Sequence, residues 1–193
     1  MSPQPSDAAR PVADPATQRD AATQWALAAR GGDPLAQAAL VRATQAEVWR
    51  FVAALVDPGS ADDLTQETYL RAFRALPGFE GRSTVRTWLL GIARRTCADH
   101  VRTVVRQRRL DTRLAGEAAT GGLHPDPAGQ VSAAQLLERL SPERREAFVL
   151  TQLLGLPYEQ AAAVLEVPVG TIRSRVARAR ADLVTSVVTA LAA

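Results

Sequence analysis

The chain of 193 residues contains no lysine, so all 23 of its basic side chains are arginines. This absence excludes nucleotide chemistry that needs a Walker lysine and catalysis through a lysine Schiff base. Cys97 is the only cysteine, which excludes an internal disulfide. No apolar run is long enough to span a membrane, and the first 20 residues carry no signal peptide. We therefore expect a cytoplasmic protein.

Aromatic residues are also scarce, at 5% of the chain, and the β-branched runs typical of strands are missing. Hydrophobic residues make up 47%, which is enough for packed cores, so the composition predicts an all-α globular fold. The sequence contains no pairing of nucleophile and base and no phosphate-binding glycine loop. We expect neither catalytic activity nor a cofactor.

Two small groups of residues could suggest a metal site. Cys97 and His100 are three residues apart, but His124 is the only other histidine or cysteine, so a tetrahedral zinc site lacks ligands. Asp62 and Asp63 have no further carboxylates at matching spacing, and the dipole at a helix N-terminus accounts for them. We therefore predict structural roles for these residues and no bound metal.

Proline and glycine residues divide the chain into two predicted domains. Four prolines lie within the first 20 residues, and a second stretch rich in glycine and proline ends near Gln130. The predicted segments are a disordered tail over 1–20, a first domain of four helices over 21–106, a flexible linker over 107–130, a second domain over 131–186 and a short tail over 187–193.

Capping signals predict where the helices of the first domain begin. Asp33 is a good N-cap for a second helix, which ends before the Asp-Pro-Gly sequence of residues 57–59. Ser60 is expected to cap a third helix, and a loop over 77–84 leads to a long fourth helix. The apolar arc that predicts the buried side of this fourth helix consists of Val85, Leu89, Ile92, Ala93 and Thr96.

Positive charge gathers in one part of the chain. Residues 82–113 hold nine arginines against Asp99 and Asp111, a net charge of +7, whereas the whole chain carries +3. Four of these arginines recur on the fourth helix at spacings of seven, four and three residues, namely Arg95, Arg102, Arg106 and Arg109. Such a stripe can follow a phosphate backbone, which indicates a polyanionic partner.

Residues 156–180 are typical of a helix-turn-helix, with a short helix, a tight turn and an arginine-rich second helix. The second helix places Ile172, Val176, Ala179 and Leu183 on one side and Arg173, Ser174, Ala177 and Arg178 on another. Arginine forks fit guanine edges and phosphates, so the second set predicts a face that reads the major groove. The alternative is a helix whose arginines only keep it soluble, but no acidic residue between Glu166 and Asp182 neutralises them.

Three motifs resemble those of bacterial RNA polymerase sigma factors. They are residues 62–74 (DDLTQETYLRAFR), 87–95 (TWLLGIARR) and 168–175 (PVGTIRSR), and together they look like the extracytoplasmic-function (ECF, group IV) class of the sigma-70 family. The resemblance covers roughly residues 21–186. It implies that a region 2-like first domain binds the clamp helices in the largest subunit of core RNA polymerase and opens the −10 element. A region 4-like second domain would read the −35 element, and an anti-sigma factor would be a further partner.

The resemblance also implies roles for individual residues. Clamp binding would fall on Asp63, Gln66, Glu67, Leu70 and Arg74, which share one helical face. The alternative for this face is an ordinary solvated surface with intrahelical ion pairs. The loop that captures a flipped base of the −10 strand would be Phe79, Glu80, Gly81, Arg82, Ser83 and Thr84, with strand phosphates held by Arg86, Arg94, Arg95 and Arg102. The −35 contacts would be Thr171, Arg173, Ser174, Arg175, Ala177 and Arg178 in the groove, and Tyr158 and Glu159 at the DNA backbone.

Some features leave other interpretations open. Glu166 stands where the turn in this family usually has glycine, and a side chain is unfavourable at φ > 0, so we expect the local turn to differ. Trp88 is either core or a stacking surface, and we favour core. The alternative function is a stand-alone helix-turn-helix regulator, which would leave the basic fourth helix unexplained. A protein that imitates or sequesters parts of the polymerase would need an acidic surface instead.

Overall fold

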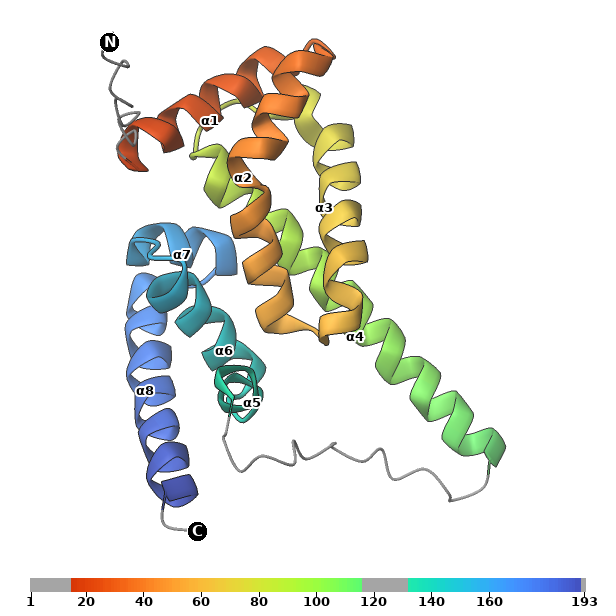
Figure 1. Cartoon of the computed structure of the whole chain (residues 1–193), viewed down its shortest axis with the longest axis vertical. Coiled ribbons are helices and arrows are strands. Elements are labelled where there is room, and N and C mark those ends of the chain that lie inside the picture. The colour runs from red at the N-terminus through yellow and green to blue at the C-terminus, as the bar shows by residue number, and fades with distance from the viewer. Residues whose placement is uncertain (1–14, 116–131, 192–193) are drawn as a thin grey trace, which may run out of the picture.

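The structure is a computed structural model that describes residues 15–115 and 132–191, and these ranges contain helices and turns but no strand (Figure 1). The first domain consists of α1 (Pro15–Ala29), α2 (Pro34–Leu55), α3 (Ala61–Ala75) and α4 (Val85–Ala115), with short 3-10 turns η1 (Pro58–Ser60) and η2 (Leu76–Gly78). The second domain consists of α5 (Ala133–Glu138), α6 (Pro142–Phe148), a π-helical turn η3 (Val149–Leu153), α7 (Tyr158–Leu165) and α8 (Val169–Leu191). The predicted all-α class is confirmed. None of the described helices is long and apolar enough to cross a membrane.

Three predicted boundaries differ from the structure. α1 begins at Pro15, inside the predicted tail, and proline is favoured in the first turn of a helix. α4 continues to Ala115, nine residues into the predicted linker, and α8 continues to Leu191 through the predicted C-terminal tail. The rest of the first tail and of the linker, over 1–14 and 116–131, lies outside the described residues.

The far end of α4 was not predicted because none of its side chains described beyond His100, over 101–112, is buried. Beyond His100 most of its side chains are exposed, including Val101, Val105 and Leu110, and apolar periodicity reports only a buried side. Local hydrogen bonds support the helix there instead. The Gln107 amide donates to the Asp111 carboxylate, 2.9 Å away and four residues along.

Two predicted helix starts have different outcomes. The Asp33 carboxylate accepts the backbone N–H of Leu35 at 2.9 Å, so the predicted cap of α2 is confirmed. The prediction for Ser60 is wrong, because its hydroxyl donates to Asp57 at 2.8 Å and makes no capping bond to α3. The turn η1 intervenes, and Asp57 caps it by accepting the Ser60 backbone N–H at 3.1 Å. The hydrogen bond from the Ser60 hydroxyl holds the pKa of the Asp57 carboxyl below its ordinary value.

The core of the first domain forms where α2, α3 and α4 meet. The predicted apolar arc of α4 is buried along its whole length, from Val85 to Thr96. A polar link also lies inside this core, because the Tyr69 and Thr44 hydroxyls are 2.7 Å apart. Thr44 already donates to the Leu40 carbonyl at 2.7 Å, so Tyr69 must be the donor to Thr44. Burial raises the pKa of Tyr69 to about 12, which keeps this donor protonated.

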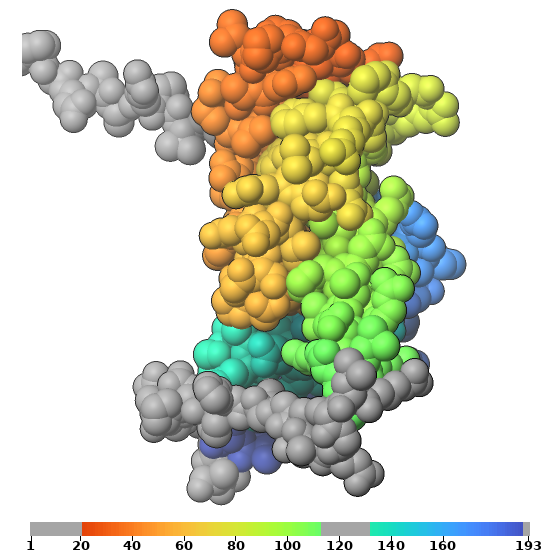
Figure 2. Space-filling view, turned by 90° about the vertical axis from the view of Figure 1, so that its right-hand side faces the viewer, coloured from red at the N-terminus to blue at the C-terminus, as the bar shows by residue number. Residues whose placement is uncertain are grey.

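The two domains pack against each other. α7 lies along α4, while α6 and η3 contact α2. Buried side chains of both domains form one continuous apolar cluster, which includes Leu89 and Ala93 of α4 and Ala161 and Val164 of α7. In Figure 2 the second domain emerges below the end of α2 and the start of α3, and behind the edge of α4.

The bond between Thr44 and Tyr69 makes a prediction about stability. We expect Thr44→Val to lower the free energy of unfolding by about 1–3 kcal/mol, because it leaves the buried Tyr69 hydroxyl without an acceptor. Tyr69→Phe removes the donor and should cost only about 1 kcal/mol. Adding Tyr69→Phe to Thr44→Val should therefore restore stability, as measured by urea unfolding. A double variant less stable than Thr44→Val alone would contradict this account.

Candidate nucleic-acid interface

Helices α7 and α8 form the predicted helix-turn-helix. The buried residues at the start of α8 are Ile172, Val176 and Ala179, and the exposed ones are Arg173, Ser174, Ala177 and Arg178. Leu183, predicted on the packing side, is half-buried. Within the described residues, neither Arg173 nor Arg178 forms an ion pair or a side-chain hydrogen bond. The predicted packing and outward faces are confirmed, and the outward face presents two free guanidinium groups.

The other residues predicted to contact the −35 element are less free. The Ser174 hydroxyl donates to the carbonyl of Thr171 at 2.9 Å, so it turns back onto the helix. Thr171 and Arg175 are half-buried. Tyr158 is half-buried and Glu159 is exposed, both in the first turn of α7. Among the residues predicted to contact the −35 element, the two free arginines are therefore exposed and unpaired within the described residues.

The turn before α8 contains the one non-glycine residue with positive φ in the part of the chain that the structure describes. Glu166 has φ 56° and ψ 43°, the left-handed conformation, and its backbone N–H bonds the carbonyl of Ala162. This is the conformation that a glycine would adopt most easily. The turn therefore keeps the left-handed backbone that glycine favours despite the side chain, and a difference from the turn of the family stays a prediction.

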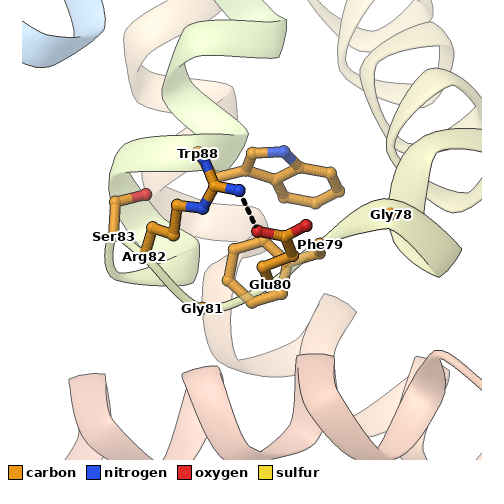
Figure 3. Close-up of a pocket in the computed structure, with 7 residues that line it drawn as sticks. All are labelled: Gly78, Phe79, Glu80, Gly81, Arg82, Ser83 and Trp88. Carbon is orange, nitrogen blue, oxygen red and sulfur yellow. Dashed lines mark ion pairs between the residues drawn. The ribbon is translucent and has the colours of Figure 1, made fainter.

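The loop between α3 and α4 forms a pocket of about 280 Å³ (Figure 3). Its lining residues are Gly78, Phe79, Glu80, Gly81, Arg82, Ser83 and Trp88. The rings of Phe79 and Trp88 lie 5.0 Å apart between centroids, at 46° to each other. Phe79 is buried and Trp88 is half-buried against the core, so Trp88 serves both as core and as pocket wall. The pocket therefore combines an aromatic wall with a polar rim.

The polar rim is held by contacts within the loop. The Arg82 guanidinium forms an ion pair with Glu80 and points back across the pocket (Figure 3). The Thr84 hydroxyl lies 3.3 Å from the backbone N–H of Thr87 and accepts from it, so Thr84 is engaged at the start of α4. Gly81 has φ 72°, which lets the loop reverse direction beneath the pocket.

The four arginines predicted to hold strand phosphates are all paired with carboxylates. Arg86 bonds Glu47 at 2.7 Å, Arg94 bonds Glu146 at 3.1 Å, Arg95 bonds Glu166 at 2.8 Å, and Arg102 bonds Asp99. Arg86 is only 8% exposed and also donates to the carbonyl of Leu154. The Arg95 guanidinium lowers the pKa of the Glu166 carboxyl, first by hydrogen bonding and then by its charge. A phosphate role for these residues stays a prediction. A guanidinium has five N–H donors, so a phosphate must either take those that the carboxylate leaves or displace the carboxylate.

The remaining part of the basic stripe is not neutralised in this way. Arg106 and Arg109 are exposed, and within the described ranges neither takes part in an ion pair. They lie on the end of α4 that extends beyond the rest of the first domain (Figure 1). Within the described residues, Arg95 and Arg102 of the stripe are therefore paired with carboxylates, whereas Arg106 and Arg109 are not.

The predicted polymerase-binding face of α3 is largely open. Asp63, Gln66, Leu70 and Arg74 are exposed, and the apolar side chain of Leu70 is 53% exposed. Glu67 differs because it bonds Arg71 at 2.8 Å, and Arg71 bonds Asp99 of α4 at 2.6 Å. An intrahelical ion pair, the alternative for this face, is therefore found only at Glu67.

Sequence reasoning missed Trp49, which lies next to this face. Its side chain is 43% exposed, and its indole N–H donates to Asp62 at 2.7 Å, at the start of α3. The residues around it form a shallow groove of about 410 Å³, lined by Arg42, Gln45, Ala46, Trp49 and Arg50. Helical periodicity could have predicted that Trp49 is exposed, because this residue falls outside the buried stripe of α2 that includes Val48 and Val52.

Cys97 and His100, the two residues considered for a zinc site, are each partly or fully buried in the fold. Cys97 is buried, and burial raises the pKa of its thiol to about 12. His100 is half-buried, with Nε2 3.9 Å from a carboxylate oxygen of Asp57. Across residues 15–115 and 132–191 no group of three potential ligands is gathered, and His124 lies outside these ranges.

Comparison with known proteins identifies both domains. The family model of Sigma-70 region 2 matches residues 40–108, and that of Sigma-70, region 4 matches residues 130–183. The ECF RNA polymerase sigma factor SigC of Mycobacterium tuberculosis is 51% identical over 172 residues, which are 86% of this chain and 90% of that protein. The ECF RNA polymerase sigma-E factor of Escherichia coli K12 is 35% identical over 164 residues, which cover 77% and 85% of the two chains.

Two solved structures are also similar. CnrH, in complex with the cytosolic domain of CnrY, matches with a TM-score of 0.68 and 26% identity over 88% of this chain and 99% of that chain. The sigma factor RpoE of Bartonella quintana, in complex with the anti-sigma factor NepR, matches with a TM-score of 0.61 and 30% identity over 74% and 91%. Region 2, region 4, the relatives and the fold all agree, so the chain belongs to the ECF class of the sigma-70 family and is a promoter-specific sigma factor that binds core RNA polymerase.

Proposed function

We propose that this sigma factor reads the −35 element with the exposed face of α8. The observation that carries the proposal is the pair of free guanidinium groups on Arg173 and Arg178, with the small side chain of Ala177 between them. A guanidinium fork matches the O6 and N7 atoms of guanine. A small neighbour allows the helix to approach the base edges closely.

The rest of the helix-turn-helix would hold the DNA backbone. Tyr158 and Glu159 lie in the first turn of α7, where free backbone N–H groups can bind a phosphate. Thr171, Ser174 and Arg175 lie beside the two reading arginines and are partly engaged within the protein. These groups therefore orient the helix on the duplex, while the free arginines carry most of the sequence preference.

The pocket beside Phe79 and Trp88 is proposed as the site for a base flipped out of the −10 strand. Flipping costs a few kcal/mol of unstacking, and stacking on an aromatic side chain returns about 1–3 kcal/mol per base. The aromatic wall supplies this stacking, and Arg82 and Ser83 on the rim supply donors for the base edge. Arg82 pairs with Glu80 through Nη2, so its other N–H groups are available to the base edge.

The exposed face of α3 is proposed to bind the clamp helices in the largest subunit of core RNA polymerase. Leu70 offers an exposed apolar group surrounded by Asp63, Gln66 and Arg74, a pattern typical of an interface with a polar rim. Glu67 belongs to the same face but is held by Arg71.

We further propose that the protein has no catalytic activity or cofactor of its own, and that an anti-sigma partner binds it as CnrY binds CnrH.

The function is tested by adding the purified protein to sigma-free bacterial core RNA polymerase with genomic fragments and sequencing the run-off transcripts. We expect discrete new transcription starts that share two upstream elements and that need both protein components. DNA binding without any dependence on the polymerase would instead favour the stand-alone regulator. The polymerase with each protein omitted in turn provides the baseline.

Loss of a reading arginine makes a sharper prediction for α8. Arg173→Ala in the holoenzyme should cost about 1–3 kcal/mol of binding to the upstream element and relax sequence preference at one position. Binding to a randomised library of upstream elements measures both effects. The matched control is Arg139→Ala, because Arg139 is also exposed in the second domain but lies at the end of α5. Unchanged affinity and preference in Arg173→Ala would rule out this reading face.

The polymerase-binding face makes a separate prediction. Gln66→Ala combined with Leu70→Ala should weaken binding to core polymerase about ten-fold, because apolar and hydrogen-bonding contacts at the centre of an interface are lost. Both side chains are exposed, so the fold should survive. A fluorescence titration with core polymerase measures the effect, with Gln24→Ala on α1 as the control. Equal affinities of the two variants would place the interface elsewhere.

A further inference from the structure

One acidic residue stands within the basic stripe of α4. Arg95 and Arg102 are seven residues apart, and Asp99 falls between them at spacings of four and three, which places all three on one helical face. The other acidic residue of α4, Asp111, is two residues from Arg109 and therefore lies on a different face. A DNA strand that follows the stripe thus passes the Asp99 carboxylate, whose charge repels phosphates.

The Asp99 carboxylate is held by two guanidinium groups. Arg71 Nη1 lies 2.6 Å from Asp99 Oδ2, and Arg102 Nη2 bonds the other oxygen, Oδ1. The hydrogen bond from Arg71, and after it the bond from Arg102, holds the pKa of the Asp99 carboxyl below its ordinary value. Asp99 therefore keeps its negative charge at neutral pH, and the stripe contains a full anion.

The first of these two arginines comes from another helix. Arg71 belongs to α3, which packs against α4, and both helices are visible on the face of the first domain that Figure 2 shows. Its Nε atom lies 2.8 Å from Glu67 Oε1 on α3, so the guanidinium is fixed between one carboxylate of each helix. The side chain of Arg71 is 37% exposed, which leaves this cation at the edge of the surface.

The charges on the stripe balance only when Arg71 is present. One guanidinium is enough to neutralise Asp99, so with Arg71 in place the charge of Arg102 remains for a phosphate. Without Arg71, Asp99 and Arg102 would neutralise each other and would add no positive charge to the stripe. A guanidinium has five N–H donors, so Arg102 has enough donors to bond Asp99 and a phosphate together.

We propose that Arg71 is a positioning residue for promoter DNA, which neutralises Asp99 and so keeps the charge of Arg102 available to the strand. Arg71 acts through these two residues of α4 and adds a side chain of α3 to the DNA-binding surface. The proposal rests on the proposed function, because it assigns Arg71 a part in promoter binding by the stripe.

Two other roles of Arg71 give different results when Asp99 is also changed. If the pair only ties α3 to α4, removal of either partner breaks the same bond and both variants lose the same function. If Arg71 binds a phosphate directly, its removal has the same effect with or without the charge at position 99. Only neutralisation predicts that removal of Asp99 compensates for removal of Arg71.

The test is a double-mutant cycle in the holoenzyme, with the full-length protein, core polymerase and one promoter fragment chosen from the run-off transcripts. We expect Arg71→Gln to weaken promoter binding about three- to ten-fold and to lower the salt slope by about one unit, the effect of one lost phosphate contact. Asp99→Asn alone should stay within about two-fold of wild type. Arg71→Gln/Asp99→Asn should regain both the affinity and the salt slope of wild type.

Three results would overturn the proposal. Equal losses in Arg71→Gln, Asp99→Asn and the double variant would show a structural tie. Equal losses in Arg71→Gln and the double variant, with Asp99→Asn unchanged, would show a direct contact of Arg71. An Arg71→Gln variant that binds the promoter like wild type would show that the charge of Asp99 does not matter.

Controls separate DNA binding from folding and from net charge. Arg30→Gln removes the same charge from the first domain, and Arg30 is exposed and in no ion pair within the described ranges. This control should bind the promoter like wild type. Arg71→Lys keeps the charge beside Asp99 and should retain most of the affinity. Urea unfolding and affinity for core polymerase are measured for each variant, and a loss of either in both Arg71→Gln and the double variant would again show a structural tie.

The role of Arg71 and the proposed function fail in distinguishable ways. Arg102→Gln removes a cation of the stripe itself, and it should weaken promoter binding and lower the salt slope by about one unit. Unchanged binding in Arg102→Gln would refute promoter binding by this part of the stripe, whatever Arg71→Gln shows. Weaker binding in Arg102→Gln without compensation between Arg71→Gln and Asp99→Asn would refute only the role of Arg71.

Discussion

The packing of α4 is the constraint on which the rest of the molecule depends. One side of this helix supplies Val85, Leu89 and Ala93 to the core and contacts α1, α2 and α3. Because that side is fixed by burial, the direction of every other side chain on the helix is fixed as well. The arginines of α4 therefore occupy set positions without any loop to hold them. A site on a packed helix is more precise than one on a flexible segment.

The absence of lysine gives this fixed surface a particular chemistry. Every cation is a planar guanidinium, which can bond a carboxylate and a phosphate with the same geometry. Arg94 and Arg95 use that geometry for carboxylates of the second domain, whereas Arg173 and Arg178 on α8 are free within the described structure. The face proposed to read the −35 element is thus unpaired within the described residues, whereas two arginines proposed to hold the −10 strand are paired with carboxylates. This difference between the two domains follows from where acidic residues lie, since both faces use the same cation.

Local patterns could predict most helices, but not the contacts between them. The cap at Asp33, the apolar arc of α4 and the two faces of α8 depend on neighbours in sequence, and all three are confirmed. The prediction that Ser60 caps α3 failed because an additional turn, η1, changed which residue needed a cap. The end of α4 was predicted too early because apolar periodicity detects buried faces, and the described side chains at that end are mostly exposed. Arg86 pairs with Glu47, 39 residues away, and no local pattern reports such a contact.

Glu166 illustrates how one residue can satisfy two demands that conflict locally. Judged within its own turn, it should be glycine, because the left-handed backbone disfavours a side chain. An exposed ion pair stabilises a fold only weakly. A gain in stability from the bond to Arg95 therefore does not by itself explain why glutamate stands at this position. The bond joins α4 to the second domain, next to the pair between Arg94 and Glu146. The left-handed turn before α8 and a contact between the two domains therefore both depend on this one side chain.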